Sequence, residues 1–317
     1  MDVLARDRAS HEPNARDLHL SSFVGRSQEL KDIDDLMARE RLVTLAGPGG
    51  VGKTRLAFRA AADAAAATAD APTAFPDGVT IVDLAPVHQD ELVQTALARA
   101  LGMLEQPGRT LDDAIADRLA DAKALLVIDN CEHVLDAARA LVQNLLRVAP
   151  NLRVLATSRE PLGISGERLY LVPPLAHPIP QELGRLDTLQ RYEAIQLFVD
   201  RARSASPSFT LTERNAHIVA RICHRLDGIP LAIELAAARA SILGVQQIEQ
   251  RLDDRFALLA RGGVSAQPRQ QTLYALVDWS YRLLGSLEAA ALRRAAVFTG
   301  SFDIDDAEAV IDGDGVE

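Results

Sequence analysis

The chain has 317 residues, enough for two or three domains, and its 48% hydrophobic content suits a globular protein with a sizeable core. Its formal net charge of −10 argues against broad non-specific binding to nucleic acid. No apolar run is long enough to span a bilayer, and residues 1–20 contain no apolar signal segment. We therefore expect a cytoplasmic protein in which Cys131 and Cys223 remain reduced thiols.

Strands and helices alternate from Phe23 to about Pro174, after a polar leader over residues 1–20 that we expect to be disordered. Short apolar runs predict strands at 42–46, 79–83, 124–129, 152–157 and 168–172. Helical patterns lie between them, at 54–69, 90–101, 110–121 and 134–148. This alternation predicts an α/β fold with a parallel, doubly wound sheet.

After Pro174 the pattern becomes helical throughout. Helices are predicted at 189–205, 213–226, 230–243, 246–259, 269–284 and 286–297, with a short amphipathic helix in the acidic segment 301–317. The proline-rich segment 177–180 and the break at 261–263 indicate domain boundaries. Between two helices, Gly228 is expected to end the first in a left-handed conformation and Pro230 to begin the second.

The most informative motif directly follows the strand at 42–46. It reads Gly47-Pro48-Gly49-Gly50-Val51-Gly52-Lys53-Thr54 and matches the phosphate-binding loop G-x-x-x-x-G-K-[ST]. The glycines let backbone N–H groups point at phosphate oxygens, and the following helix adds a partial positive charge at its N-terminus. Lys53 supplies a full charge for the β- and γ-phosphates, and Thr54 offers a hydroxyl to Mg²⁺. The motif predicts a site for a nucleoside triphosphate.

A second motif is the apolar strand Leu125-Leu126-Val127-Ile128-Asp129, which ends in an acid. In P-loop proteins, a carboxylate at this place holds Mg²⁺ beside the loop threonine, partly through water, so Asp129 and Thr54 are the predicted metal ligands. An active ATPase usually has a second acid at the next position to polarise water, but this chain has Asn130, which predicts slow hydrolysis. Glu132 either turns toward the site or serves as a first-turn acid of the following helix.

A cation follows the strand at 152–157 in Thr157-Ser158-Arg159. The carboxyl end of a strand is where ligands bind in open α/β sheets, so Arg159 is a candidate contact for the γ-phosphate. The alternative is a surface arginine paired with Glu160.

Five motifs in order resemble one family: Phe23-Val24-Gly25-Arg26, GPGGVGKT, LLVIDNCEH, TSRE and GIPLAIELAAAR. Together they resemble the NB-ARC/STAND class of signal-transduction ATPases, most nearly those of bacterial LuxR-type and SARP/AfsR-like transcriptional regulators. The resemblance implies a five-stranded parallel sheet of order 5-1-4-3-2. It also implies a nucleotide-binding domain over residues 21–176, a helical ARC-like domain over 177–262 and the start of a winged-helix domain over 263–317.

The resemblance assigns roles to particular residues. Val24, Gly25 and Arg26 match a segment over the base and ribose, Pro230 matches a proline on the adenine side, and Arg159 matches the arginine near the γ-phosphate. Lys53, Asp129 and Arg159 are then the expected catalytic residues. The expected nucleotide-binding set is Val24, Gly25, Arg26, Gly47, Pro48, Gly49, Gly50, Val51, Gly52, Lys53, Thr54, Arg55 and Pro230.

The implied function is a switch that binds ATP or ADP with Mg²⁺ and hydrolyses ATP slowly. An ADP-bound closed form opens on exchange for ATP and then self-assembles, with no membrane partner and with DNA contacted only through segments outside this chain. An active oligomeric ATPase of AAA type is one alternative, although Asn130 speaks against it. A direct DNA-binding regulator is another, and the charge of −10 disfavours it.

Overall fold

The structure is a computed structural model that describes residues 22–66, 74–103, 108–179, 186–252, 281, 284–298 and 302–311. The chain divides into two compact units, one drawn from residues 1–47 and 53–172 and the other from residues 48–52 and 173–317. The predicted leader, the break at 261–263, the end of the helix at 246–259 and nearly all of the helix at 269–284 lie outside the described residues.

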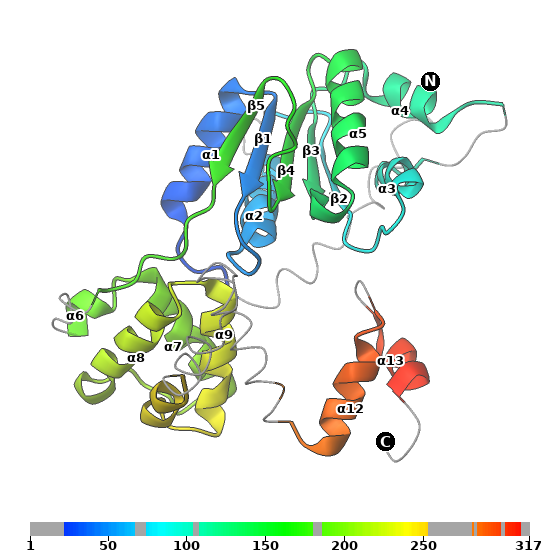
Figure 1. Ribbon diagram of the computed structural model, residues 1–317. Helices are drawn as coiled ribbons and strands as arrows, with labels where there is room; N and C mark the ends of the chain where they lie inside the picture. The colour runs from blue at the N-terminus through cyan, green and yellow to red at the C-terminus, as the bar shows by residue number, and fades with distance from the viewer. Residues whose placement is uncertain are drawn as a thin grey trace, which may run out of the picture. The chain divides into compact units, whose positions relative to one another are not determined.

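A five-stranded parallel sheet forms the centre of the first unit (Figure 1). Its strands are β1 (Leu42–Ala46), β2 (Val79–Asp83), β3 (Leu125–Asp129), β4 (Arg153–Ser158) and β5 (Glu167–Leu171). They lie in the order β2-β3-β4-β1-β5, which is the predicted order read from the other edge. The first two predicted strands have the observed bounds, and the other three differ by one residue at one or both ends.

Burial of the strands follows their place in the sheet. All residues of β1 and β3 are buried, and β4 is buried after its first residue. The edge strands β2 and β5 are largely half-buried or exposed. Because both faces of the central strands are covered, their sequences show continuous apolar runs rather than period-2 alternation.

Helices cover both faces of this sheet. On one face α3 (Val93–Ala100), α4 (Leu111–Leu119) and α5 (Leu135–Val148) share a core with Leu126, Ile128, Val154 and Ala156. The alternate strand residues point to the other face, where α2 (Lys53–Ala65) packs against β3 and β4. Beside it lies α1 (Ser27–Arg39), an amphipathic helix that the sequence prediction missed, with Ile33 and Met37 as its buried residues.

The described part of the second unit is helical. It contains α6 (Leu186–Leu189), α7 (Glu193–Ala205), α8 (Glu213–Arg225), α9 (Pro230–Ala238), a helical stretch at 245–252, α12 (Ser286–Ala295) and α13 (Ile304–Ile311). The predicted helix at 189–205 is divided, because Tyr192 is extended (φ −73°, ψ 127°) and precedes a new helix start. The predicted helix at 230–243 ends earlier, in the 3₁₀-turn η5 (Arg239–Ser241).

The turn between α8 and α9 has the predicted chemistry. Gly228 has φ +64°, and an added Cβ would lie 2.2 Å from the carbonyl oxygen of Leu175. The Leu175 N–H donates to the Gly228 carbonyl (2.9 Å), and Pro230 occupies the first turn of α9. Both the left-handed φ and the close approach to Leu175 therefore require glycine.

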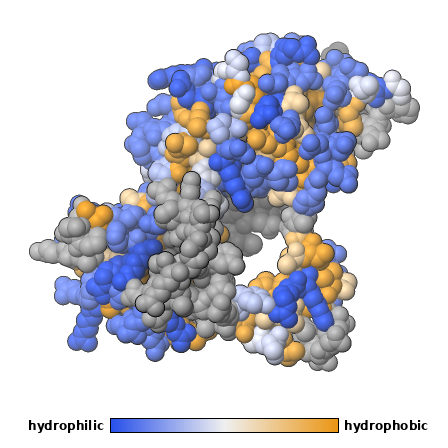
Figure 2. All heavy atoms as spheres, viewed as in Figure 1, coloured by the Kyte–Doolittle hydropathy of each residue, from blue (hydrophilic) through white to orange (hydrophobic). Residues whose placement is uncertain are grey.

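Apolar side chains gather on the segment that carries α12 and α13 (Figure 2). Leu287, Leu292, Val297, Phe302 and Ile304 are exposed there. None of the helices in the described ranges has the length and hydropathy that a bilayer span requires. Cys131 and Cys223 are both buried free thiols.

Candidate nucleotide-binding site

The loop between β1 and α2 has the backbone that the motif requires. Gly50 and Gly52 adopt φ +77° and +95°, which side-chain-bearing residues rarely reach. A Cβ on Gly49 would meet no atom within 4 Å, so the space beside this residue is open. A loop of this kind leaves backbone N–H groups available to an anion at the start of a helix.

Lys53 begins α2 and is 8% exposed. Its Nζ donates to the carbonyl of Gly47 (2.8 Å), so the side chain folds back over the loop. Burial lowers the pKa of Lys53, while the nearby carboxylate of Glu132 raises it and the Arg159 guanidinium lowers it. A phosphate oxygen is a stronger partner for this ammonium than a carbonyl oxygen, because the interaction is then between two charges.

The loop threonine and the acid at the end of β3 are in direct contact. Thr54 Oγ1 donates to Asp129 Oδ1 (2.9 Å), and Thr157 Oγ1 donates to the same oxygen (2.5 Å). Asp129 is 1% exposed. Burial raises the pKa of Asp129 to about 6, against the opposing effect of the hydrogen bonds from Thr157 and Thr54.

This donor set fits Mg²⁺. A hydroxyl and a carboxylate are hard oxygen ligands, and protein sites for Mg²⁺ with nucleotides use one or two such groups together with phosphate oxygens and water. Within the described ranges no cluster of three or more His, Cys, Asp or Glu side chains forms an all-protein metal site. Thr54 and Asp129 therefore suit a metal ion that binds together with a phosphorylated ligand.

Asn130 is committed to the neighbouring carboxylates. It adopts φ +61°, and its Nδ2 donates to Asp129 Oδ2 (2.9 Å) and to Asp83 Oδ1 (3.2 Å). Its backbone N–H donates to Thr157 Oγ1 (3.0 Å). The side chain of Asn130 thus acts as a donor that fixes two acids, and an amide cannot accept a proton from water.

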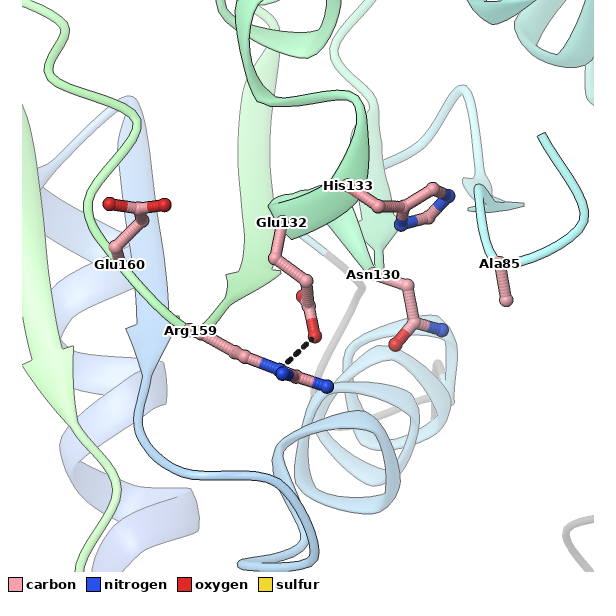
Figure 3. Close-up of a pocket in the computed structure, with 6 residues that line it drawn as sticks. All are labelled: Ala85, Asn130, Glu132, His133, Arg159 and Glu160. Carbon is pink, nitrogen blue, oxygen red and sulfur yellow. Dashed lines mark hydrogen bonds and ion pairs between the residues drawn. The ribbon is translucent and has the colours of Figure 1, made fainter. Parts of the chain in front are cut away.

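Beside these residues the carboxyl edge of the sheet is hollowed into a cavity of about 470 Å³ (Figure 3). Glu132, on the 3₁₀-helix η3 (Cys131–His133), faces Arg159, which follows β4 (Figure 3). Arg159 Nε lies 3.1 Å from Glu132 Oε1. Arg159 therefore pairs with Glu132 and not with Glu160, and Glu132 precedes α5 instead of opening its first turn.

His133 anchors the loop that forms another wall of this cavity. Its Nε2 lies 2.8 Å from the carbonyl oxygens of both Leu84 and Val87. Both contacts need a donor, so Nε2 carries the proton. The interaction ties the loop after β2 to the start of η3.

The segment Val24-Gly25-Arg26 lies beside the phosphate-loop helix. Gly25 and Arg26 have φ +69° and +65°, and the Arg26 side chain is buried and pairs with Glu29 (2.7 Å). Arg55 of α2 donates to the carbonyl of Ser22 (2.8 Å). Arg55 is therefore a residue that holds the N-terminal segment in place.

Pro230 belongs to the second unit, together with loop residues 48–52. Within that unit the Leu231 N–H donates to the Gly50 carbonyl (3.2 Å). A Cβ on Gly52 would lie 3.9 Å from Cγ of Pro230. Pro230 thus lies close to Gly52 of the loop, and its contact with the adenine side of a nucleotide stays a prediction.

Sequence reasoning missed two residues beside Asp129, the acid Asp83 and the hydrogen-bond donor Thr157. Asp83 ends β2 as Asp129 ends β3, and the two residues are paired in register. Two neighbouring strands that both end in Asp gave a usable signal. Thr157 had no such signal, since its hydroxyl reaches Asp129 only through the β3–β4 pairing.

The loop, the carboxylate at the end of β3 and the sheet order define the class: this is a P-loop ATPase. The AAA ATPase domain family matches residues 22–156. The uncharacterized protein Rv0894 of Mycobacterium tuberculosis is 44% identical over 292 residues, which cover 92% of this chain and 69% of that protein. The chain belongs to the same family of P-loop ATPases as Rv0894.

Two further likenesses bear on the family. Rv0890c of M. tuberculosis, named as a candidate HTH-type transcriptional regulator, is 45% identical over 278 residues, 88% of this chain but 29% of that protein. A solved STAND protein with a tetratricopeptide repeat sensor from Pyrococcus horikoshii shares the fold, with TM-score 0.52 and 18% identity over 90% of this chain and 36% of that one. The predicted resemblance to STAND ATPases and to the ATPase cores of transcriptional regulators is confirmed.

Proposed function

We propose that this chain is an ATP- and ADP-binding switch with slow hydrolysis, acting in the cytoplasm as the regulatory ATPase core of a transcriptional regulator. The observation that carries the proposal is the contact between Thr54 and Asp129, 75 residues apart, at the loop that presents Lys53. These three groups supply a cation for phosphate and two oxygen ligands for Mg²⁺. Bound Mg²⁺ would neutralise charge on the phosphates during hydrolysis.

Slow hydrolysis is supported by the environment of Asn130. Its amide donates to two carboxylates, so it does not take the place of the acid that polarises water in fast ATPases. ATP then stays bound for a long time before its γ-phosphate is hydrolysed. A nucleotide-controlled switch needs such a long-lived bound state.

The same proposal gives roles to the surrounding residues. Val24, Gly25 and Arg26 lie over the base and ribose, Arg159 reports the γ-phosphate, and Pro230 couples the nucleotide to the helical domain. We assign a nucleotide-binding domain to residues 21–176, an ARC-like domain to 177–262 and part of a winged helix to 263–317. ADP holds a closed arrangement of these domains, and ATP releases it for self-assembly.

The role in transcription rests on similarity to Rv0890c, of which this chain spans 29%. We expect the helices α12 and α13 to contribute to a domain that supports the switch. DNA recognition is expected to belong to other segments of the regulator.

The experiment is to purify the chain, identify any nucleotide that it carries, and follow ATP turnover in the wild type and in Lys53→Ala. The proposal expects a carried or tightly bound adenine nucleotide and turnover well below about 10 s⁻¹, the median for enzymes. Lys53→Ala should abolish both binding and turnover. Turnover above that median would favour an active oligomeric ATPase instead.

A further inference from the structure

One ion pair in the cavity at the sheet edge joins two adjacent strand ends. Glu132 follows β3, Arg159 follows β4, and these two strands are paired in the sheet. The Arg159 Nε–Glu132 Oε1 distance is 3.1 Å, and Figure 3 marks this pair with a dashed line between two side chains that line the cavity. The acid is thus held against the cation that the proposed function assigns to the γ-phosphate.

The two members of the pair are held very differently. The Glu132 side chain is 18% exposed, whereas that of Arg159 is 67% exposed. Glu132 Oε2 is buried and has no hydrogen-bond partner among the described residues. A buried carboxylate oxygen without a partner is costly to the fold, so packing holds this oxygen while Oε1 accepts from Arg159. Arg159 is the more exposed member of the pair, and its side chain lines the cavity.

Glu132 also acts on the lysine of the phosphate loop. Burial lowers the pKa of Lys53, and the carboxylate of Glu132 is the strongest charge that opposes this effect. The carboxylate of Glu132 thus interacts electrostatically with Lys53 and forms an ion pair with Arg159. A γ-phosphate that reaches Arg159 must replace this acid as the partner of the guanidinium.

We infer that Glu132 sets the discrimination between ATP and ADP by competing with the γ-phosphate for Arg159. The inference rests on the proposed nucleotide function. ATP can engage Arg159 only if the ion pair with Glu132 opens, whereas ADP binds with the pair intact. The pair therefore weakens the binding of ATP and leaves that of ADP nearly unchanged, so Glu132 favours the ADP-bound state of the switch.

The test is calorimetric titration of the whole chain with Mg²⁺ and either ADP or a non-hydrolysable ATP analogue. Glu132→Gln keeps the size of the side chain and removes its charge. We expect this variant to bind the ATP analogue about fivefold more tightly than the wild type, the scale of a partly exposed ion pair, with ADP affinity changed less than twofold.

Glu160→Gln is the matched control. Glu160 lines the same cavity and follows Arg159 directly, yet it makes no ion pair among the described residues (Figure 3). Removing its charge tests whether any lost negative charge near the cavity improves ATP binding. We expect its ratio of ATP-analogue to ADP affinity to stay within twofold of the wild type.

A double-mutant cycle with Arg159→Ala separates competition from direct repulsion. If Glu132 acts through Arg159, Glu132→Gln has no effect on the affinity ratio in the Arg159→Ala background. An undiminished effect in that background, or an equal gain for both nucleotides, overturns the inference while nucleotide binding stands. Failure of the wild type to bind either nucleotide overturns the proposed function and the inference together.

Discussion

Thr54 Oγ1 donates a 2.9 Å hydrogen bond to Asp129 Oδ1, joining the first turn of α2 to the end of β3. In this arrangement the two expected Mg²⁺ ligands bond to each other. Asp129 is nevertheless a buried acid, with a pKa raised to about 6 by that burial. The charge of Asp129 therefore lowers the stability of the fold without a ligand, and it favours binding once a cation is present.

Asp129→Asn should stabilise the protein without nucleotide at pH 8. The raised pKa means that the folded state binds a proton more tightly than the unfolded state, so stability is lost as pH rises from about 4 through 6. The rise in the pKa of Asp129 to about 6 corresponds to ~3 kcal/mol of stability. We expect the variant to gain about 2 kcal/mol of this, because its amide N faces the amide N of Asn130. The measurement is urea unfolding of both proteins, with hydrogen exchange in β1, β3 and β4 as the probe of the sheet. A variant less stable than the wild type at pH 8 contradicts the prediction.

Nucleotide binding with Mg²⁺ should weaken as the pH falls below about 6. Only the charged carboxylate of Asp129 is a good ligand, and its pKa is raised to about 6. Thr157→Val removes a hydrogen bond that stabilises the charged form, so the midpoint of this loss should move to higher pH. Titration of Mg²⁺-ADP at several pH values gives the midpoint. If the pH midpoint for loss of Mg²⁺-ADP binding is the same in Asp129→Asn, a group other than Asp129 causes the loss.

Asn130→Asp should destabilise the protein without making a faster ATPase. The substitution replaces an amide donor by a third carboxylate against Asp83 and Asp129, leaving two acceptors without their hydrogen bonds. We expect a loss of about 2 kcal/mol at pH 8 that shrinks at pH 5, where the acids take up protons. Asn130→Gly removes the donors without adding charge and keeps the positive φ, so its loss should be smaller and nearly independent of pH.

Gly228→Ala should destabilise the helical unit by more than about 2 kcal/mol, because the new Cβ adds a clash with the Leu175 carbonyl to an unfavourable positive φ. Gly108→Ala is the matched control, with φ +82° and no atom within 4 Å of the new Cβ, and should lose only about 1 kcal/mol. Hydrogen exchange resolved by segment measures each loss in its own unit. Equal losses of stability in the two variants would show that the close approach of Gly228 to the Leu175 carbonyl does not affect stability.

Much of the sheet could be predicted because its central strands are buried on both faces. The runs at 42–46 and 79–83 have the observed bounds. The acid Asp129 could be singled out because it ends an apolar strand. The helix α1 was missed although its sequence is amphipathic, with Ile33 and Met37 buried four residues apart on one face. The acids that end β2 and β3 were visible in the sequence, while the residues that hydrogen-bond to them were not.

The pairing of Arg159 illustrates what a local pattern leaves open. Glu160 is adjacent in sequence and was the expected partner of a surface arginine, yet Glu132 is the partner. The choice depends on the β3–β4 register and on the 3₁₀-turn after β3, neither of which a local pattern specifies. Tertiary placement of short polar segments thus decides the electrostatics of the site.

The central claim is that the site holds a nucleotide more than it consumes one. A single-turnover measurement tests it: one equivalent of labelled ATP is mixed with the chain and Mg²⁺, and bound ATP, bound ADP and released phosphate are followed with time. The account predicts that label stays with the wild-type chain through slow conversion of ATP to ADP, and that Lys53→Ala retains none. Rapid conversion with prompt release of ADP, or no retention of label by the wild type, would contradict it.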